Sequence, residues 1–220
     1  MTLGVLGGTF DPIHLGHVAA GLAAQQALSL ESVVLVPSRI PPHRVDPVTA
    51  SAEHRLAMAQ LAAADQRGWS TSRIELDREG PSYTFDTLVA LQQAAPGSQL
   101  FFITGADAFA EIATWWRYPA VLDLAHFVVV SRPGITLDSL RDRVPSAFPS
   151  TALTAGGRDA SAKTRVILVE ANTPDVSSTD IRRRARAGET ISGLVPESVA
   201  RYIRAHHLYL GPPQAQKAQN

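Results

Sequence analysis

The sequence predicts an α/β fold of the Rossmann type, a doubly wound parallel sheet with a small C-terminal helical part. Short apolar runs alternate along the chain with longer segments of helical periodicity. The runs are apolar throughout, not at every second residue, which is typical of strands buried on both faces of a parallel sheet. We expect one domain over residues 1–210, because 220 residues that are 45% hydrophobic suffice for one core.

The expected strands follow the apolar runs in chain order. The first run ends at two glycines and the second at Pro37, both of which are turn signals. A later segment alternates between apolar and polar residues, as a strand nearer the edge of the sheet would. The strands are therefore expected at 3–6, 33–36, 72–77, 100–104, 127–131 and 165–170.

Helices are expected between these strands and at the C-terminal end, where the apolar spacing is helical. They lie at 18–28, 52–66, 84–95, 107–115, 119–125, 178–187 and 196–207. Two stretches, 37–51 and 146–164, have no such period and are expected as loops, and 211–220 as a disordered tail. Ligands of such sheets bind beyond the carboxyl ends of the strands, where the turns at 7–17, 104–107 and 131–134 are expected.

Composition excludes several classes of function. The formal net charge is zero, which argues against a general surface for nucleic acid or anionic membranes. The chain contains no cysteine, so disulfides and thiol catalysis are excluded. We see no signal-peptide pattern and no apolar run of about eighteen residues, so we expect a cytoplasmic protein without a membrane partner.

The most informative motif is Gly7-Gly8-Thr9-Phe10-Asp11-Pro12-Ile13-His14-Leu15-Gly16-His17, directly after the first apolar run. The glycines allow a tight turn and a close approach of backbone to a ligand. His14 and His17 are three residues apart at a helix start, so both can face the same way beside free N–H groups, an arrangement that suits a polyphosphate. The spacing also leaves zinc binding by the two histidines open, although no third ligand stands out.

A second motif, Val176-Ser177-Ser178-Thr179-Asp180-Ile181-Arg182, predicts a helix start. Ser177 can cap the helix, with Asp180 at the capping-box position. The hydroxyl and amide groups of Ser177, Ser178 and Thr179 could equally hold phosphate oxygens, with Arg182 one turn further on. The three following arginines are expected on the solvated face: Arg183, Arg184 and Arg186.

These motifs resemble a known superfamily. The first is similar to the G-x-F-D-x-x-H-x-G-H signature of adenylyl- and cytidylyltransferases, and the second resembles their I-S-S-T-x-I-R element apart from Val176. Further stretches resemble the bacterial nicotinate-mononucleotide adenylyltransferases in particular: 37–44, 80–88, 105–115, 194–203 and 208–209. The resemblance spans residues 3–210 and is weakest over 135–164.

The resemblance implies a reaction in which ATP and nicotinate mononucleotide give nicotinate adenine dinucleotide and pyrophosphate. The attacking phosphate oxygen is already ionised, so positioning and electrostatic stabilisation matter more than a strong base. Mg²⁺ would arrive with ATP and be held mostly by substrate, so no metal site of the protein itself is expected.

The resemblance also implies roles for individual residues. The catalytic residues would be His14, His17 and Arg182. ATP would contact these three residues and Gly7, Gly8, Thr9, Phe10, Gly105, Asp107, Ser177, Ser178 and Thr179. Nicotinate mononucleotide would contact Thr9, Arg44, Thr84, Trp115 and Trp116, with Arg117 nearby.

Alternatives remain open for several of these residues. Asp107 could instead be a helix N-cap, and Trp115 a core aromatic residue. Trp116 and Tyr118 could lie in the core or at the rim, and Arg117 could be merely solvated.

Other functions remain open as well. The phosphate acceptor could be nicotinamide mononucleotide or phosphopantetheine, or the protein could be a nucleotide-binding regulator without catalysis. Phosphopantetheine enzymes are usually shorter and lack the 80–88 and 105–115 stretches, and cytidylyltransferases usually carry R-T-x-G-I-S-T-T. The sequence also leaves a homo-oligomer open.

Overall fold

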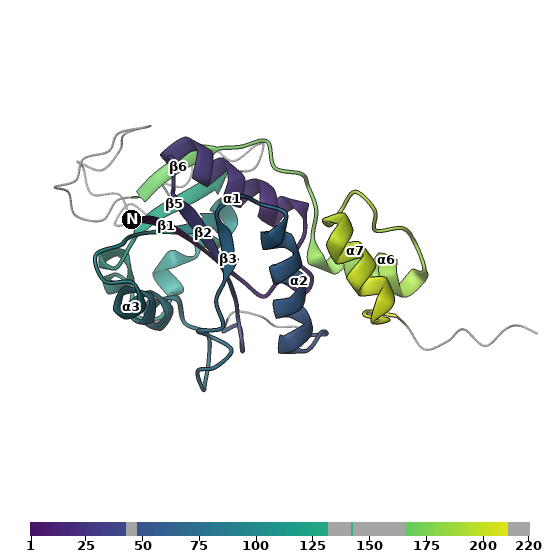
Figure 1. Ribbon diagram of the computed structural model, residues 1–220. Helices are drawn as coiled ribbons and strands as arrows, with labels where there is room; N and C mark the ends of the chain where they lie inside the picture. The colour runs from purple at the N-terminus through teal and green to yellow at the C-terminus, as the bar shows by residue number, and fades with distance from the viewer. Residues whose placement is uncertain (43–47, 132–141, 143–165, 211–220) are drawn as a thin grey trace, which may run out of the picture.

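A six-stranded parallel sheet forms the centre of the protein (Figure 1), as seen in a computed structural model that describes residues 1–42, 48–131, 142 and 166–210. The strand order is β3-β2-β1-β4-β5-β6, and every neighbouring pair is parallel. This order reverses direction between β1 and β4, as in doubly wound nucleotide-binding folds. The strands are β1 (Thr2–Gly8), β2 (Ser32–Pro37), β3 (Trp69–Thr71), β4 (Gln99–Gly105), β5 (His126–Ser131) and β6 (Val166–Glu170).

Two apolar clusters cover the two faces of the sheet, and the side chains of β2 show how. Val33 and Leu35 join the cluster that includes α1 (Leu15–Leu28) and α2 (Ala52–Ala64). Val34 and Val36 join the opposite cluster, which includes α3 (Thr84–Ala94), α4 (Ala106–Ala110) and the short 3₁₀ helices η1 (Ile112–Thr114) and η2 (Ala120–Asp123). Successive residues of a strand point to opposite faces, so the continuous apolar runs correspond to strands buried on both sides.

The C-terminal helices α6 (Ser178–Ala187) and α7 (Glu197–Ala205) lie at one side of the sheet, with α7 next to α2 (Figure 1). Val199 and Ile203 of α7 are buried in the same apolar cluster as α2. Two polar contacts join α7 to α2 and its end: Ser198 donates to Asp65 over 2.8 Å, and Tyr202 Oη lies 3.0 Å from His54 Nδ1. The small C-terminal helical part is therefore packed on the α/β core.

The α/β prediction is confirmed, with local corrections. The strand predicted at 72–77 is wrong: the edge strand is β3, and the chain then turns, with the Asp77 amide donating to the Arg73 carbonyl over 2.9 Å. The alternating pattern there belongs to a turn in which Leu76 and its neighbour Glu75 are both buried, and short patterns do not distinguish such a turn from a strand. The predicted helix at 107–115 divides into α4 and η1, and the one at 119–125 is the 3₁₀ helix η2.

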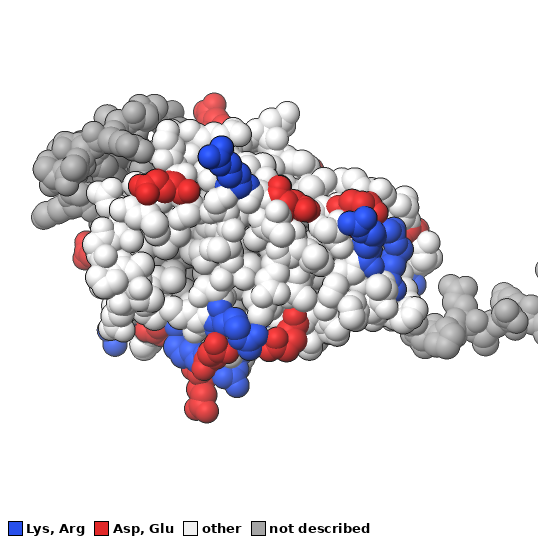
Figure 2. Space-filling view, in the orientation of Figure 1, with Lys and Arg blue, Asp and Glu red and all other residues white. Residues whose placement is uncertain are grey.

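Positive and negative side chains are interspersed on the face shown in Figure 2. Many are paired: Arg73 bridges Glu53 and Asp77, and Arg183 bridges Asp180 and Glu189. Over the described ranges, no helix is long and apolar enough to cross a membrane.

Gly21 allows α1 to pack closely against β3, and this contact yields a stability prediction. A Cβ at Gly21 would lie 2.4 Å from the Trp69 ring, whose indole N–H is held by Gln25 Oε1 over 2.8 Å. Gly21→Ala should therefore lower the thermal midpoint, although alanine alone favours a helix by about 1 kcal/mol. In a Trp69→Ala background, the same substitution should be neutral or stabilising. If Gly21→Ala changed the thermal midpoint equally in the wild-type and Trp69→Ala backgrounds, the proposed contact would be contradicted.

Candidate active site

The main chains of β1 and β4 part at the carboxyl end of the sheet. The ladder between these strands ends at the Leu6–Ile103 pair, before Gly8 and Gly105, where the strands themselves end. The strand order also reverses here, at what we call the switch point, which is where open α/β sheets bind ligands. The glycines at both strand ends let ligand atoms approach the backbone closely. The observed topology therefore has a switch point at the place where the sequence predicts the site.

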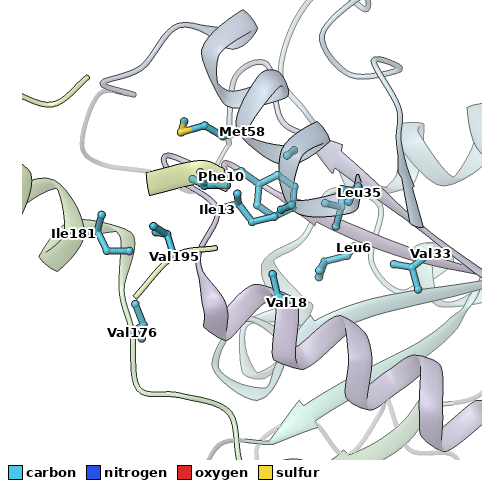
Figure 3. Close-up of a cluster of buried hydrophobic side chains, with 14 of the residues drawn as sticks. Leu6, Phe10, Ile13, Val18, Val33, Leu35, Met58, Val176, Ile181 and Val195 are labelled. Carbon is cyan, nitrogen blue, oxygen red and sulfur yellow. The ribbon is translucent and has the colours of Figure 1, made fainter. Parts of the chain in front are cut away.

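The 9–14 loop follows β1 and is held in a strained backbone conformation at Phe10. Phe10 has φ of 50°, a region that costs a bulky residue roughly 1–3 kcal/mol. Its side chain is 1% exposed and lies in the core beside Ile13 and Met58 (Figure 3). A Cβ at Gly8 would lie 2.7 Å from this ring, so glycine is required there for the loop to close over its own phenyl group.

Three backbone carbonyls of the 9–14 loop are bound by side chains from other elements. Arg55 of α2, only 2% exposed, donates to the Thr9 carbonyl over 2.7 Å. From α6, Arg182 donates to the Asp11 carbonyl and Ser178 to the Pro12 carbonyl, each over 2.9 Å. These contacts flank Phe10 on both sides and offset the cost of its conformation.

Two amide N–H groups of the same loop, unlike its carbonyls, are not bound by other elements among the described residues. Within the described ranges, no acceptor lies in hydrogen-bonding geometry to the amides of Thr9 and Phe10. With the neighbouring carbonyls already engaged, these N–H groups are free main-chain dipoles at the end of β1. Consecutive N–H groups of this kind form a concave site for phosphate oxygens.

His14 and His17 lie together at the start of α1, as predicted. Their rings stack with centroids 3.7 Å apart, and the Phe10 ring meets His17 edge-on at 5.2 Å. The His14 amide donates to His17 Nδ1 over 3.2 Å. Because Nδ1 accepts, the proton of the neutral His17 ring lies on Nε2, which is then a donor for a ligand. His14 is buried and His17 is half-buried, so His17 is the more accessible of the two.

The second motif begins α6, but part of its polar chemistry is used internally. Ser177 is the N-cap and accepts from the Asp180 amide over 3.1 Å. Ser178 and Arg182 hold the 9–14 loop, and Arg182 also donates to Thr179 Oγ1 over 3.2 Å. Ser177 and Thr179 are exposed, whereas Arg182 is buried. Arg183 and Arg184 pair with acidic side chains at the surface, in agreement with the predicted solvated face.

Gly105 and Asp107 lie on the β4 side of the switch point. Gly105 is the N-cap of α4 and is exposed, and a Cβ added there would meet nothing within 4 Å. The alternative that Asp107 is the N-cap is therefore wrong. Asp107 lies inside the first turn and is exposed to solvent.

The residues predicted to contact nicotinate mononucleotide gather around the start of α3. Thr84 is its first residue, and the N-cap Tyr83 makes no side-chain cap, so the first amides of α3 are available to an anion. Trp116 is 49% exposed and stacks on Tyr83 at 5.3 Å, while the Arg117 guanidinium lies 4.7 Å from the Phe85 ring.

Trp115 has a different environment from its neighbour. It is half-buried and meets Phe102 edge-on at 6.0 Å. The Phe102 ring in turn lies below Gly7, 3.5 Å from where a Cβ would be. Trp115 is thus anchored in the core and also lies close to the end of β1.

Sequence reasoning missed a buried polar group beneath the start of α3. Glu75 accepts from Thr87 Oγ1 over 2.6 Å, and Arg78 donates to the same hydroxyl over 3.1 Å. Burial raises the pKa of Glu75, in spite of the hydrogen bonds from Thr87 and Ser82. No sequence pattern marks this glutamate, because it is one of the polar residues of the alternating segment predicted as a strand.

Several predictions lie outside the described residues. They are Arg44, the turn at 132–134, the loop at 146–164 and the tail at 211–220. Within the part of the chain that is described, no group of three or more His, Cys, Asp or Glu side chains could hold a metal ion. The histidine pair at the start of α1 therefore has no third ligand there for zinc.

Comparisons with known proteins identify the family. The model of the cytidylyltransferase-like family matches residues 5–184. A probable nicotinate-nucleotide adenylyltransferase of Desulfatibacillum aliphaticivorans is 40% identical, over 96% of this chain and all of its own. The protein of the same name from Roseiflexus sp. is 43% identical, over 94% of this chain and 97% of its own.

A solved structure shares the fold at lower identity. The nicotinic acid mononucleotide adenylyltransferase of Plasmodium falciparum, complexed with NaAD, superposes with a TM-score of 0.70 at 17% identity, over 94% of this chain and 97% of its own. The family match, the near-complete overlap with the bacterial relatives and the geometry at the end of β1 agree. The chain belongs to the cytidylyltransferase-like family and, within it, to the nicotinate-nucleotide adenylyltransferases.

Proposed function

We propose that this protein transfers the adenylyl group of ATP to nicotinate mononucleotide, giving nicotinate adenine dinucleotide and pyrophosphate. The observation that carries the proposal is the 9–14 loop, whose carbonyls are tied back while its amides and the adjacent histidine pair lie at the switch point of the sheet. Relatives of about this length, 40–43% identical, carry the corresponding name.

ATP would occupy the switch point between β1 and α4. Its phosphates would accept from the amides of Thr9 and Phe10, from the His17 ring and from the positive end of α1, with Gly7, Gly8 and His14 shaping the turn. Gly105 and Asp107 would contact the ribose, whose hydroxyls suit an exposed carboxylate acceptor.

The start of α6 would lie at the far end of the ATP phosphates. The exposed hydroxyls of Ser177 and Thr179 would contact phosphate oxygens there. Ser178 and Arg182 would act mainly by holding the loop, and Arg182 would add positive charge close to the leaving group.

Nicotinate mononucleotide would occupy the region at the start of α3. Its pyridine carboxylate is an acceptor-only anion, which suits the uncapped amides and the hydroxyl of Thr84. Trp115 and Trp116 would bound the pyridine ring, with Arg117 and Arg44 supplying positive charge and Thr9 contacting the acceptor phosphate.

In the proposed reaction an oxygen of the acceptor phosphate attacks the α-phosphorus of ATP. The bond from this phosphorus to the bridging oxygen breaks, and pyrophosphate leaves with the electron pair. The attacking oxygen is already ionised, so the enzyme's residues would align two polyanions and stabilise the charge that develops. Mg²⁺ would enter as part of the ATP substrate and neutralise its phosphates. A single domain over 1–210 and a cytoplasmic location belong to the same proposal.

Acceptor selectivity tests the proposed function directly. We expect kcat/KM for nicotinate mononucleotide to exceed that for nicotinamide mononucleotide by at least about a hundredfold, because an amide NH₂ would oppose the donors at the start of α3. The measurement is pyrophosphate release with each acceptor, and with phosphopantetheine, at the same MgATP concentration. Equal values, or a preference for the amide, would overturn the acceptor. No release with any acceptor, despite ATP binding, would favour a non-catalytic regulator.

Replacing His17 tests the phosphate site. His17→Ala should stay folded and lose roughly 10²-fold or more in kcat, because it removes a donor aimed at transition-state charge. His126→Ala is a matched control, since His126 begins β5 at the opposite end of the sheet. Near-normal turnover by the folded His17 variant would exclude this role.

Replacing Arg182 by lysine tests the buried guanidinium. Lysine carries its donors on a single nitrogen and lacks the fork by which two guanidinium nitrogens reach the Asp11 carbonyl and Thr179, so kcat/KM for ATP should fall roughly tenfold to a hundredfold. Arg183→Lys is the control, because Arg183 is the exposed neighbour in surface ion pairs. If both variants retain wild-type kinetics, Arg182 has no part in the reaction.

A further inference from the structure

A buried carboxylate connects the 9–14 loop to the C-terminal end of the described chain. Asp11 is 1% exposed, and its carboxylate accepts from the amides of Thr49 over 2.8 Å and Ala50 over 3.0 Å. It also accepts from the hydroxyl of Tyr209 over 2.9 Å. Asp11 follows Phe10 directly, so these three donors act on the loop at its strained residue.

The burial and the protonation of Tyr209 both favour this contact. Tyr209 lies beyond the end of α7, is 6% exposed, and has φ of 64°, a conformation that carries a backbone cost. Burial, followed by the charge of Asp11, raises the pKa of Tyr209, so its hydroxyl remains a proton donor at neutral pH. A hydrogen bond to a buried carboxylate is among the strong ones in proteins.

The contact completes a set that surrounds the loop. Arg55 reaches the Thr9 carbonyl from α2, and Ser178 reaches the Pro12 carbonyl from α6. The Leu15 amide, at the start of α1, donates to the Leu194 carbonyl over 2.9 Å. Figure 3 shows the apolar part of the same junction, with Val195 and Ile181 of the C-terminal part on one side and Phe10 and Ile13 on the other. Among the described residues, Tyr209 is the member of this set nearest to the C-terminus.

We propose that Tyr209 is a positioning residue for adenylyl transfer, which holds the 9–14 loop through Asp11 in the conformation that receives phosphate. The proposal rests on the function proposed above. The C-terminal helical part then has a catalytic purpose as well as a structural one. A loop with two free amides next to a strained residue needs support from behind, because misplacement of such donors by about 1 Å can cost roughly a hundredfold in rate.

The chain offers a matched pair of variants for the test. Tyr209→Phe removes the hydroxyl on Asp11, and Tyr202→Phe removes a hydroxyl on His54, also in the C-terminal part but away from the loop. We expect Tyr209→Phe to lower kcat/KM for ATP about tenfold, the effect of losing one hydrogen bond to a charged group. Tyr202→Phe should leave kcat/KM unchanged, even where both variants lower the thermal midpoint equally. Equal kinetics of the two variants would overturn the proposal.

Two further measurements keep the test decisive. Asp11→Asn, alone and combined with Tyr209→Phe, should give effects that are not additive, whereas Asp11→Asn with Tyr202→Phe should be additive. If Tyr209→Phe does not fold, Tyr209→Leu takes its place. Fully additive effects of Tyr209→Leu and Asp11→Asn in the double variant would count against the contact.

The loop itself can be followed without any turnover. Amide hydrogen exchange of a peptide covering 7–17 should speed up in Tyr209→Phe and not in Tyr202→Phe, whereas peptides from α3 should be unaffected in both. If the wild type releases no pyrophosphate from ATP and nicotinate mononucleotide, the proposed function fails. In that case, amide exchange and the affinity for a non-hydrolysable ATP analogue still decide whether Tyr209 holds the loop. If neither differs between Tyr209→Phe and the wild type, Tyr209 does not hold the loop.

Discussion

Most of the candidate site depends on hydrogen bonds from buried arginine side chains to main-chain carbonyls of the 9–14 loop. Arg55 and Arg182 are cations that the fold has buried, and burying a guanidinium is costly unless its donors are used. Their partners are the carbonyls of Thr9 and Asp11, on either side of Phe10. The charges are thereby satisfied, the strained Phe10 is held, and among the described residues the amides of Thr9 and Phe10 have no acceptor and can serve a ligand at the switch point.

This arrangement explains why the helices lie where they do. α2 and α6 each carry one arginine to the loop, and each helix must be packed in place for its own arginine to reach its carbonyl. The apolar cluster that includes Met58, Ile181 and Val195 joins them (Figure 3). A polyanion site on a nearly neutral protein therefore needs no basic patch, because main-chain dipoles and helix ends provide a local positive field.

The fold class and most element positions could be predicted from the sequence, whereas the place of the site stays a prediction. Uninterrupted apolar runs indicated buried strands, and the Gly-Gly turn with His14 and His17 marked the end of β1. The segment 72–77 was wrongly predicted as a strand, since a short alternating pattern also fits the turn that buries Leu76. The break between α4 and η1 was also missed, because helical spacing alone does not show where a helix tightens into 3₁₀ geometry.

Local sequence specifies which motifs exist: the turn after β1, the capped start of α6 and the side chains that resemble a nucleotidyltransferase site. The roles of Arg55, Asp11 and Tyr209, in contrast, emerge only in the folded chain. The partners of Arg55 are backbone carbonyls, which every residue carries and no residue type announces. Tyr209 and Asp11 are far apart in sequence, so their contact depends on how α7 packs. Local patterns record the propensities of neighbouring residues, whereas burial and distant hydrogen bonds arise only when the whole chain has folded.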